Sequence, residues 1–80
     1  MTRVTVLYFA SLRDAAGVAS EVLDSDANDL RGLYVALRAR HGFTMPWEQL
    51  RVAVDGAFAR WDNALQVGSE VAFIPPVSGG

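Results

Sequence analysis

The 80-residue sequence contains no cysteine and no lysine, and it has a single histidine. Without cysteine, the chain can form neither a disulfide framework nor a cysteine-based zinc site or nucleophile. No apolar run approaches the roughly 20 residues that span a bilayer, and the chain begins directly in a strand-like pattern without a signal-peptide core. With a formal net charge of −2, it also lacks the basic surface of nucleic-acid binders. We therefore expect a cytoplasmic protein with neither membrane nor nucleic acid as a partner.

The residues that are present favour one small folded domain. Hydrophobic residues make up 51% of the chain, which is enough for a modest core and argues against disorder. A chain of this length buries only about 60% of the surface that its unfolded form exposes, so nearly every strong apolar run must belong to the core.

Strand patterns occur in five segments. We expect strands at 3–9, 18–24, 51–54, 57–61 and 70–74. The first is almost entirely β-branched, aromatic or aliphatic and is typical of a central strand, whereas the second carries acidic residues and suits an edge. Asp55-Gly56 indicates a hairpin between the third strand and the short return strand.

Helical spacing occurs in two segments. Residues 10–17 predict a short helical turn that ends at glycine, and residues 28–41 predict the main helix. The apolar stripe of this helix is Leu30, Leu33, Tyr34 and Leu37, and Ser25, Asp26 or Asn28 can cap it. The order of elements predicts an α+β roll of the β-grasp type, with one main helix across a mixed four- to five-stranded sheet. We expect a domain over 1–74 and an extended tail over 75–80.

Three separated segments resemble the small, sulfur-carrying subunits of molybdopterin synthase, which are ubiquitin-like β-grasp proteins. They are Tyr8-Phe9-Ala10-Ser11-Leu12-Arg13-Asp14-Ala15-Ala16-Gly17, Val52-Ala53-Val54-Asp55-Gly56, and Gly68-Ser69-Glu70-Val71-Ala72-Phe73-Ile74-Pro75-Pro76-Val77-Ser78-Gly79-Gly80. The similarity covers the whole chain. Two positions depart from the family pattern, because Asp55 stands where asparagine is common and Ile74 where an aromatic residue is common.

The resemblance assigns the chemistry to the last residue. It implies that the C-terminal carboxylate of Gly80 is adenylated with ATP by a ubiquitin-activating-like adenylyltransferase and then converted to a thiocarboxylate with sulfur from a donor protein. The sulfur would pass to cyclic pyranopterin monophosphate in the large catalytic subunit, within a synthase heterotetramer. No cofactor would be bound, and the chain would not be an enzyme by itself.

The residues of the tail suit this chemistry. Pro75 and Pro76 cannot donate to a strand ladder, so they end the last strand and project an arm that includes Val77 and Ser78. Segment 75–80 reaches at most about 20 Å, and Gly79 and Gly80 have no Cβ, so a narrow channel can close around them. A glycine pair alone is a weak signal, because a frayed terminus or a cloning scar also produces it.

Strand parity suggests which side chains surround the tail. In the last strand, a solvated Glu70 places Ile74 on the outward face, and in the return strand Arg60 does the same for Phe58. We expect Phe58 and Ile74 to form an apolar partner surface, unless a bulge or the curvature of the sheet buries one of them. Arg60 and Arg13 are the charged candidates for this interface, and simple solvation of Arg13 is the alternative.

No other residue pattern indicates catalysis. His41, at a helix C-terminus, is read as a dipole partner or an exposed side chain rather than as a metal ligand. Nothing fixes two of the carboxylates together as an acid–base pair, and no phosphate-binding glycine loop is present. Three rivals to the synthase subunit remain: a thiamine-pathway sulfur carrier, a ubiquitin-like protein modifier, and an interaction module with an inert tail.

The missing lysine has two explanations. All seven basic residues are arginine, which codon bias in a GC-rich genome explains most simply. The chemical explanation is that a chain with an activated C-terminus gains by lacking amine nucleophiles of its own.

Overall fold

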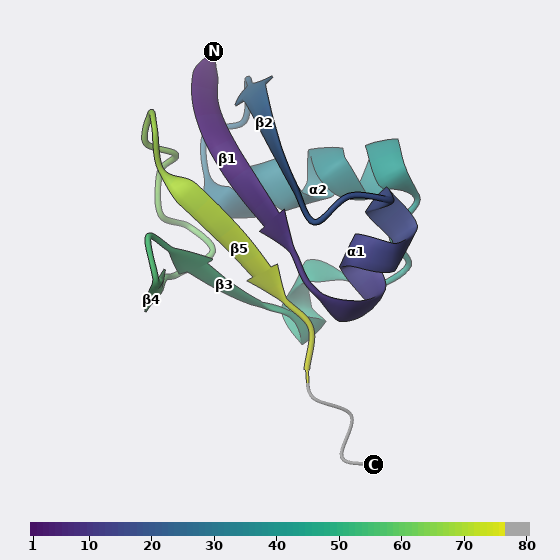
Figure 1. The fold of residues 1–80 in the computed structure, drawn as a ribbon. Helices are drawn as coiled ribbons and strands as arrows, with labels where there is room; N and C mark the ends of the chain where they lie inside the picture. The colour runs from purple at the N-terminus through teal and green to yellow at the C-terminus, as the bar shows by residue number, and fades with distance from the viewer. Residues whose placement is uncertain (77–80) are drawn as a thin grey trace.

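A computed structural model describes residues 1–76, in which one helix crosses one face of a five-stranded sheet and leaves the other face open (Figure 1). The elements are β1 (Thr2–Tyr8), α1 (Ala10–Ala16), β2 (Ser20–Ser25), α2 (Leu30–His41), a 3-10 turn (Trp47–Gln49), β3 (Arg51–Val54), β4 (Ala57–Phe58) and β5 (Glu70–Ile74). The predicted α+β arrangement of one main helix on a mixed sheet is therefore confirmed.

The first and last strands lie side by side at the centre of the sheet. The strand order is β2-β1-β5-β3-β4, and β1 and β5 run parallel while all other neighbours are antiparallel. A parallel pair requires a crossover connection, and the segment between β1 and β5 that contains α2 supplies it. The prediction of a central first strand and of an edge position for the second is confirmed.

The core lies between the sheet and α2. Alternate residues of β1 and β5 point toward the helix, and Val6, Val71 and Phe73 are each fully buried. The expected stripe of α2 packs against them, with Tyr34 also fully buried. Because burying a side chain of this size stabilises the fold by about 1.5–3 kcal/mol, this layer of alternating residues dominates the stability of a small domain.

The main helix begins two residues later than predicted. Asp29 is the N-cap, with an extended backbone and a carboxylate oxygen that accepts from the Gly32 N–H at 2.8 Å. The residues before it pair with a distant loop instead: Asp29 forms an isolated bridge with Ala64, and the Asn28 carbonyl accepts from the Leu65 N–H. This tertiary pairing holds residue 28 outside the helix.

The return strand is shorter than predicted, since β4 contains only Ala57 and Phe58. The chain then turns toward α2, where the Trp61 carbonyl accepts from the Arg31 N–H at 3.0 Å. The Trp61 ring stacks on Phe73 with centroids 5.9 Å apart. Packing of this large ring therefore ends β4 early. The second strand also differs, because the structure places it at 20–25 rather than 18–24.

The predicted hairpin between β3 and β4 is confirmed. Asp55 and Gly56 both have positive φ, at 51° and 87°, as a two-residue hairpin turn of type I′ requires. Asp55 has a second role, because its carboxylate accepts from the Glu70 N–H at 2.9 Å. This bond ties the hairpin to the start of β5.

Candidate functional site: the open sheet face at the end of β5

The last strand ends where the predicted tail begins. β5 finishes at Ile74 between two neighbouring strands, and Pro75 and Pro76 carry the chain beyond the sheet (Figure 1). Proline has no N–H for the ladder, so the strand ends at this point. The predicted tail residues Val77, Ser78, Gly79 and Gly80 lie outside the described residues.

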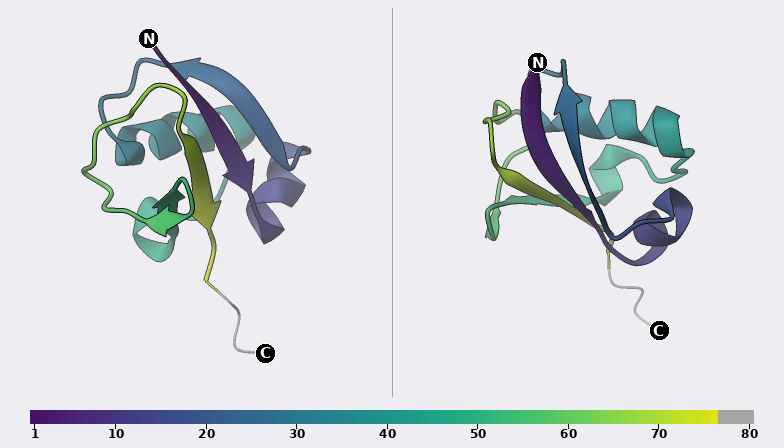
Figure 2. Two further views of the ribbon diagram at one scale, coloured as in Figure 1. Left: turned by 60° about the vertical axis from the view of Figure 1, so that its left-hand side comes forward. Right: turned by 45° about the horizontal axis from the view of Figure 1, so that its top comes forward.

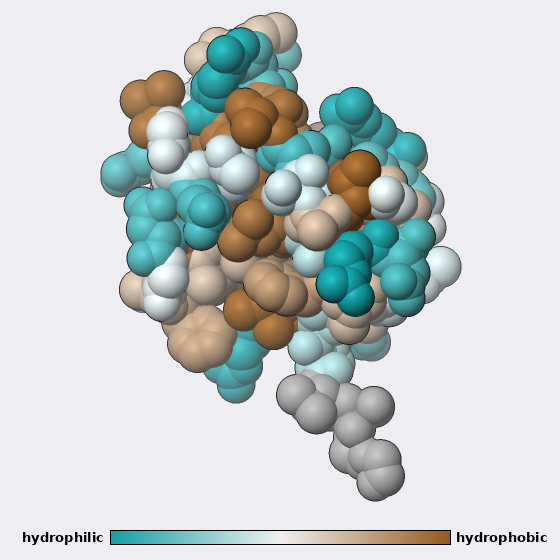
Figure 3. Space-filling view, viewed as in Figure 1, coloured by the Kyte–Doolittle hydropathy of each residue, from teal (hydrophilic) through white to brown (hydrophobic). Residues whose placement is uncertain are grey.

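Apolar side chains gather on the open face of the sheet next to this point. We call them the apolar patch, and its members are Leu7, Phe9, Ala53, Phe58, Ala72 and Ile74. They line a groove of about 260 Å³, and apolar residues are seen over the open face in Figure 3. Phe58 is 70% exposed and Phe9 is 45% exposed. Exposed aromatic side chains grouped in this way are typical of a protein interface.

The parallel pairing of β1 with β5 assembles the patch. Tyr8 is the register partner of Phe73, so the residue after Tyr8 reaches the end of the sheet where Ile74 lies. Tyr8 points into the core, and strand alternation turns Leu7 toward the open face. Sequence reasoning missed Leu7 and Phe9, although the same parity argument applied to the first strand identifies both.

The predicted interface residues do not all lie together. Phe58 and Ile74 line the same groove, with Ile74 half-buried. Arg60 lies beyond β4, and its guanidinium is 3.4 Å from the carboxylate of Asp62, with both side chains exposed. Arg13 lies on α1, where its backbone N–H donates to the Phe9 carbonyl at 3.4 Å, and it is absent from the lining of the groove.

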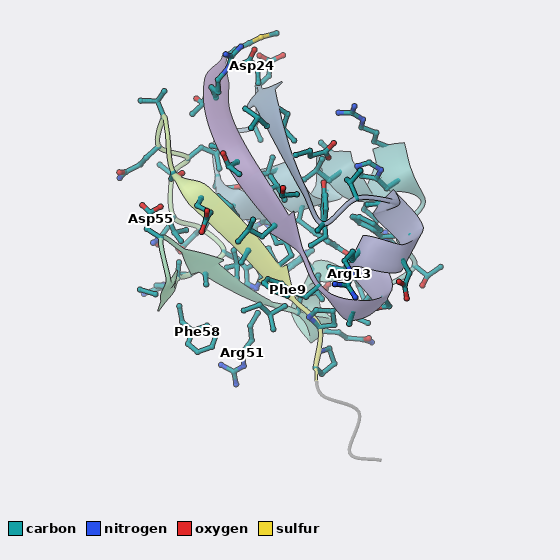
Figure 4. All side chains as sticks on the ribbon, in the orientation of Figure 1. Phe9, Arg13, Asp24, Arg51, Asp55 and Phe58 are labelled. Atoms are coloured by element: carbon teal, nitrogen blue, oxygen red, sulfur yellow. The ribbon has the colours of Figure 1, made fainter. Side chains whose placement is uncertain are left out.

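Arg51 is a cationic residue beside the end of β5 that sequence reasoning missed. It is the register partner of Ile74, and its guanidinium lies over the Phe58 ring, 5.7 Å from the centroid. Figure 4 shows the two side chains next to each other. Together with Trp61 and Pro75 they line a second groove of about 720 Å³. Arg51 shares its outward parity with the patch residue Ala53, and this is the signal that could have identified it.

Charge is distributed unequally along the open face. Glu70 is the first residue of β5, and Asp55 is bonded to it. Arg51 lies beside the other end of β5, away from Asp55 (Figure 4). A partner with the opposite arrangement of charges would be oriented with respect to the tail, since complementary charges set register more than affinity.

A polar cluster on the helix side of the sheet connects β1, β2 and α2. The Tyr8 hydroxyl donates to Glu21 at 2.5 Å, and His41 Nε2 lies 2.9 Å from the same carboxylate oxygen. Burial opposes ionisation of Glu21, but the hydrogen bonds from Tyr8 and His41 and the nearby charge of Arg40 outweigh it and lower the Glu21 pKa. Burial and the bond to Glu21 raise the pKa of Tyr8.

His41 lies in the last turn of α2, as expected of a dipole partner, but its side chain is not exposed. Its side chain is only 13% exposed, and it is held by Glu21 and by the rings of Tyr8 and Phe43 at 5.5 and 5.3 Å.

Within residues 1–76, no group of three or more histidine, aspartate or glutamate side chains is arranged as metal ligands. Neither helix of that region has the length and apolar character needed to cross a bilayer.

The strand order, the single long helix and the parallel central pair define a ubiquitin-like β-grasp fold. SAMP1 of Haloferax volcanii, a small archaeal modifier protein, superposes with a TM-score of 0.79 and 27% identity over 98% of this chain and 99% of that one. Subunit 1 of the Helicobacter pylori molybdopterin-converting factor, solved in complex with subunit 2, shares the fold with a TM-score of 0.68 and 22% identity, covering 99% and 100% of the two chains.

Comparison of its sequence with known proteins identifies the family of the chain. Residues 6–80 match the model of the ThiS family, so the chain belongs to the ThiS family. It is 32% identical over 80 residues to the molybdopterin synthase sulfur carrier subunit of Escherichia coli, and the match covers 96% of this chain and 99% of that subunit. The predicted resemblance to sulfur-carrier subunits is confirmed at the level of the family.

Proposed function

We propose that this protein is a cytoplasmic sulfur carrier and the small subunit of a molybdopterin synthase, with the C-terminal carboxylate of Gly80 as its working group. The observation that carries the proposal is the match to sulfur-carrier subunits across nearly the whole chain, combined with a last strand that leads directly into Pro75-Pro76. Residues 1–74 act as the docking domain, and residues 75–80 act as the arm that enters the active site of a partner.

The chemistry has three steps. A free carboxylate is a poor electrophile at neutral pH, so an oxygen of Gly80 first attacks the α-phosphorus of ATP and displaces pyrophosphate, with an adenylyltransferase as the catalyst. The outer sulfur of a persulfide on a donor protein then attacks the acyl carbon and displaces AMP, which forms an acyl disulfide between Gly80 and the donor. A thiol attacks the donor's sulfur in this disulfide, so that a new disulfide forms on the donor and Gly80 is released as the thiocarboxylate. Because the chain contains no cysteine, the transferred sulfur must come from outside.

The apolar patch explains how one carrier serves successive partners. Phe58 and Phe9 offer exposed aromatic surface next to the base of the arm, and Arg51 adds a cation at the same place. We propose that the large synthase subunit and the adenylyltransferase both bind here, with Ile74 at the centre and Arg13 and Arg60 at the rim. In a heterotetrameric synthase, the large subunit would supply the catalytic pocket and this chain the sulfur.

A second candidate is a ubiquitin-like modifier that is joined to lysines of other proteins. The observation that favours it is the likeness to SAMP1 over almost the full length of both chains. It requires the same adenylated Gly80, but the acyl group would pass to an amine instead of receiving sulfur. A thiamine-pathway carrier differs again only in the acceptor of the sulfur.

Intact mass spectrometry tests the carrier. The chain is incubated with ATP, a sulfur donor and an adenylyltransferase that is shown to be active on a known carrier. We expect the mass change of one oxygen replaced by one sulfur, and we expect a variant without Gly80 to show none. An unchanged mass with active enzyme contradicts the proposal.

The molecule that accepts the sulfur or the acyl group distinguishes the synthase subunit from the thiamine-pathway carrier and the protein modifier. The thiocarboxylated chain is mixed with a large synthase subunit and cyclic pyranopterin monophosphate, and the dithiolene product is measured. Product formation supports the synthase subunit, whereas a thiocarboxylate that yields no dithiolene product favours the thiamine pathway. Covalent attachment to lysines of other proteins identifies a modifier.

A further inference from the structure

The two edges of the sheet differ in length. β4 forms one edge and contains two residues, whereas β2 forms the other and contains six. β2 pairs with β1 continuously from Thr2↔Ser25 to Leu7↔Ser20, and it contains no proline. A long and regular edge strand is a template for pairing with another chain, so β2 is the edge at which this sheet can be extended.

The register of β2 identifies the backbone groups that point away from the sheet. The Tyr8 N–H donates to the Ala19 carbonyl at 2.8 Å, so these two residues form a hydrogen-bonded pair of the antiparallel ladder. Such pairs alternate with non-bonded ones, which turns the N–H and C=O groups of Ser20, Val22 and Asp24 away from β1. None of the turn, loop or cap hydrogen bonds within residues 1–76 uses these groups.

The spacing of these groups allows β2 to pair with a copy of itself. In an antiparallel pair centred on Val22, this residue faces its own equivalent, and Ser20 faces Asp24 of the second copy. All three outward residues then lie in hydrogen-bonded pairs, which gives about six main-chain bonds. Val22 is 64% exposed, and this pairing brings its apolar side chain against the same side chain of the copy. A two-fold axis at Val22 therefore uses the whole edge.

The charges beside β2 are self-complementary about this axis. A groove of about 570 Å³ lies between β2 and α2 (Figure 2), with Asp26 at one end and Arg40 of α2 in its lining. Arg40 is close enough to Glu21, near the start of β2, to act on its carboxylate. Neither Asp26 nor Arg40 forms an ion pair within the described residues. An antiparallel copy reverses the groove, so Arg40 of each copy lies toward Asp26 of the other.

The acidic residues of β2 do not oppose this pairing. Glu21 points into its own domain, where the Tyr8 hydroxyl donates to it and His41 Nε2 lies 2.9 Å from it. Asp24 pairs with Arg3 at 3.0 Å, and in this register it faces a serine of the copy. No two carboxylates are therefore direct partners across the joint, where like charges would be destabilising.

A second copy covers this edge more completely than a single added strand does. A strand from another protein would itself become a new long edge, whereas the sheet of a second copy ends in its own β4. Both long edges are then removed at once, and a two-residue edge is too short to continue the sheet. The copy also brings its own α2 toward the groove, whose apolar lining includes Leu23, Ala36 and Leu37. A single strand supplies no such helix.

We propose that this protein forms a symmetric dimer in which the β2 strands of two copies pair antiparallel about Val22, with Asp26 of each copy toward Arg40 of the other. The two five-stranded sheets become one continuous sheet. Because the axis reverses the direction of the strands, the two β5 strands point in opposite directions. The joint lies at the edge of the sheet and leaves the apolar patch open, so the proposal does not rest on sulfur transfer.

Sedimentation equilibrium of the full chain tests the dimer. An interface made by one strand pair and one groove is small, so we expect weak association and measure it from about 10 µM to about 1 mM. The mass should rise from that of one chain toward that of two, and no larger species should form. A one-chain mass throughout this range overturns the proposal, as does continued growth beyond two chains.

Backbone NMR over the same concentrations locates the joint. We expect the amides of Ser20, Val22 and Asp24 to gain protection from hydrogen exchange as the chain associates. The amides of Glu21 and Leu23 should change little in protection, because they already bond to β1. Association that shifts only amides of the open face overturns the proposal, because the apolar patch is then the interface.

Two variants of Val22 test the axis. Val22→Pro removes an N–H that faces away from β1, and proline is tolerated at an edge position of this kind. Both central bonds of the dimer are lost, so we expect association to weaken by about tenfold or more. Val22→Thr keeps the N–H and the β-branched shape, and its dissociation constant should stay within about threefold of that of the unaltered chain. A folded Val22→Pro that dimerises equally well overturns the proposal.

A charge exchange tests the identity of the occupant and does not depend on the folding of Val22→Pro. Asp26→Arg places two arginines at each end of the joint, and Arg40→Glu places two carboxylates there, so each variant alone should dimerise about fivefold or more weakly. Mixed together, the two variants restore an opposite pair at both ends and should associate about as well as the unaltered chain. A mixture that associates no better than either variant alone overturns the proposal.

Discussion

Replacing Phe58 by alanine separates binding from folding at the apolar patch. The side chain is 70% exposed, and a phenylalanine buries about 150–250 Å² when it is covered. Roughly 140 Å² is therefore available to a partner, which at about 25 cal/mol per Å² gives an upper limit of about 3.5 kcal/mol. We expect Phe58 to be a hot spot of this interface, for which truncation to alanine costs about 2 kcal/mol, so binding to the large synthase subunit should weaken about 30-fold.

The same substitution should affect folding less. About a third of the side chain is already buried, and the contact with Arg51 is exposed to solvent. We expect the free energy of unfolding to fall by about 1 kcal/mol, which lowers Tm by about 4–8 °C in a domain of this size. Isothermal titration calorimetry measures the first effect and urea unfolding the second.

Val67→Ala is the matched control. Val67 is 79% exposed and lies in the turn that precedes β5, at the end of the strand remote from Ile74. We expect its affinity for the partner to stay within about twofold of the unaltered chain. If both variants bind equally well, or if the loss in binding of Phe58→Ala matches its loss in stability, the assignment of the patch is refuted.

Three further predictions concern the domain itself. Tyr8→Phe removes the hydroxyl that donates to Glu21 and should lower the free energy of unfolding by about 1.5–3 kcal/mol at neutral pH. Because the Glu21 pKa is lowered in the fold, the difference between variant and unaltered chain should shrink as the pH falls below the ordinary Glu value of 4.5. Urea unfolding at several pH values measures this difference. Asp29→Ala should cost about 1 kcal/mol through loss of the helix cap, with Asp29→Asn as the conservative control, and an unchanged urea midpoint contradicts it. Gly56→Ala should cost about 1–2 kcal/mol because its φ is 87°, whereas an unaltered Tm contradicts the assigned turn geometry.

Local sequence patterns predicted most of the elements because each depends on near neighbours in the chain. The α2 stripe, the glycine that ends α1 and the Asp55-Gly56 turn all have signals of this kind. The patterns failed where a distant contact decided the outcome. The helix starts late because residues 28 and 29 pair with the loop at 64–65, and β4 ends early because Trp61 packs on Phe73.

The sequence by itself determined that a strand runs into two prolines and a glycine pair, and strand parity predicted that Phe58 and Ile74 face outward unless a bulge or the curvature of the sheet buries one of them. It could not determine what lies beside them. Phe9 reaches the base of the tail only because β1 and β5 pair in parallel, and Arg51 does so only because β3 aligns it with Ile74. These neighbours come from opposite parts of the chain, so only the tertiary structure, through the register of the sheet, decided which side chains lie beside Ile74, where the last strand ends.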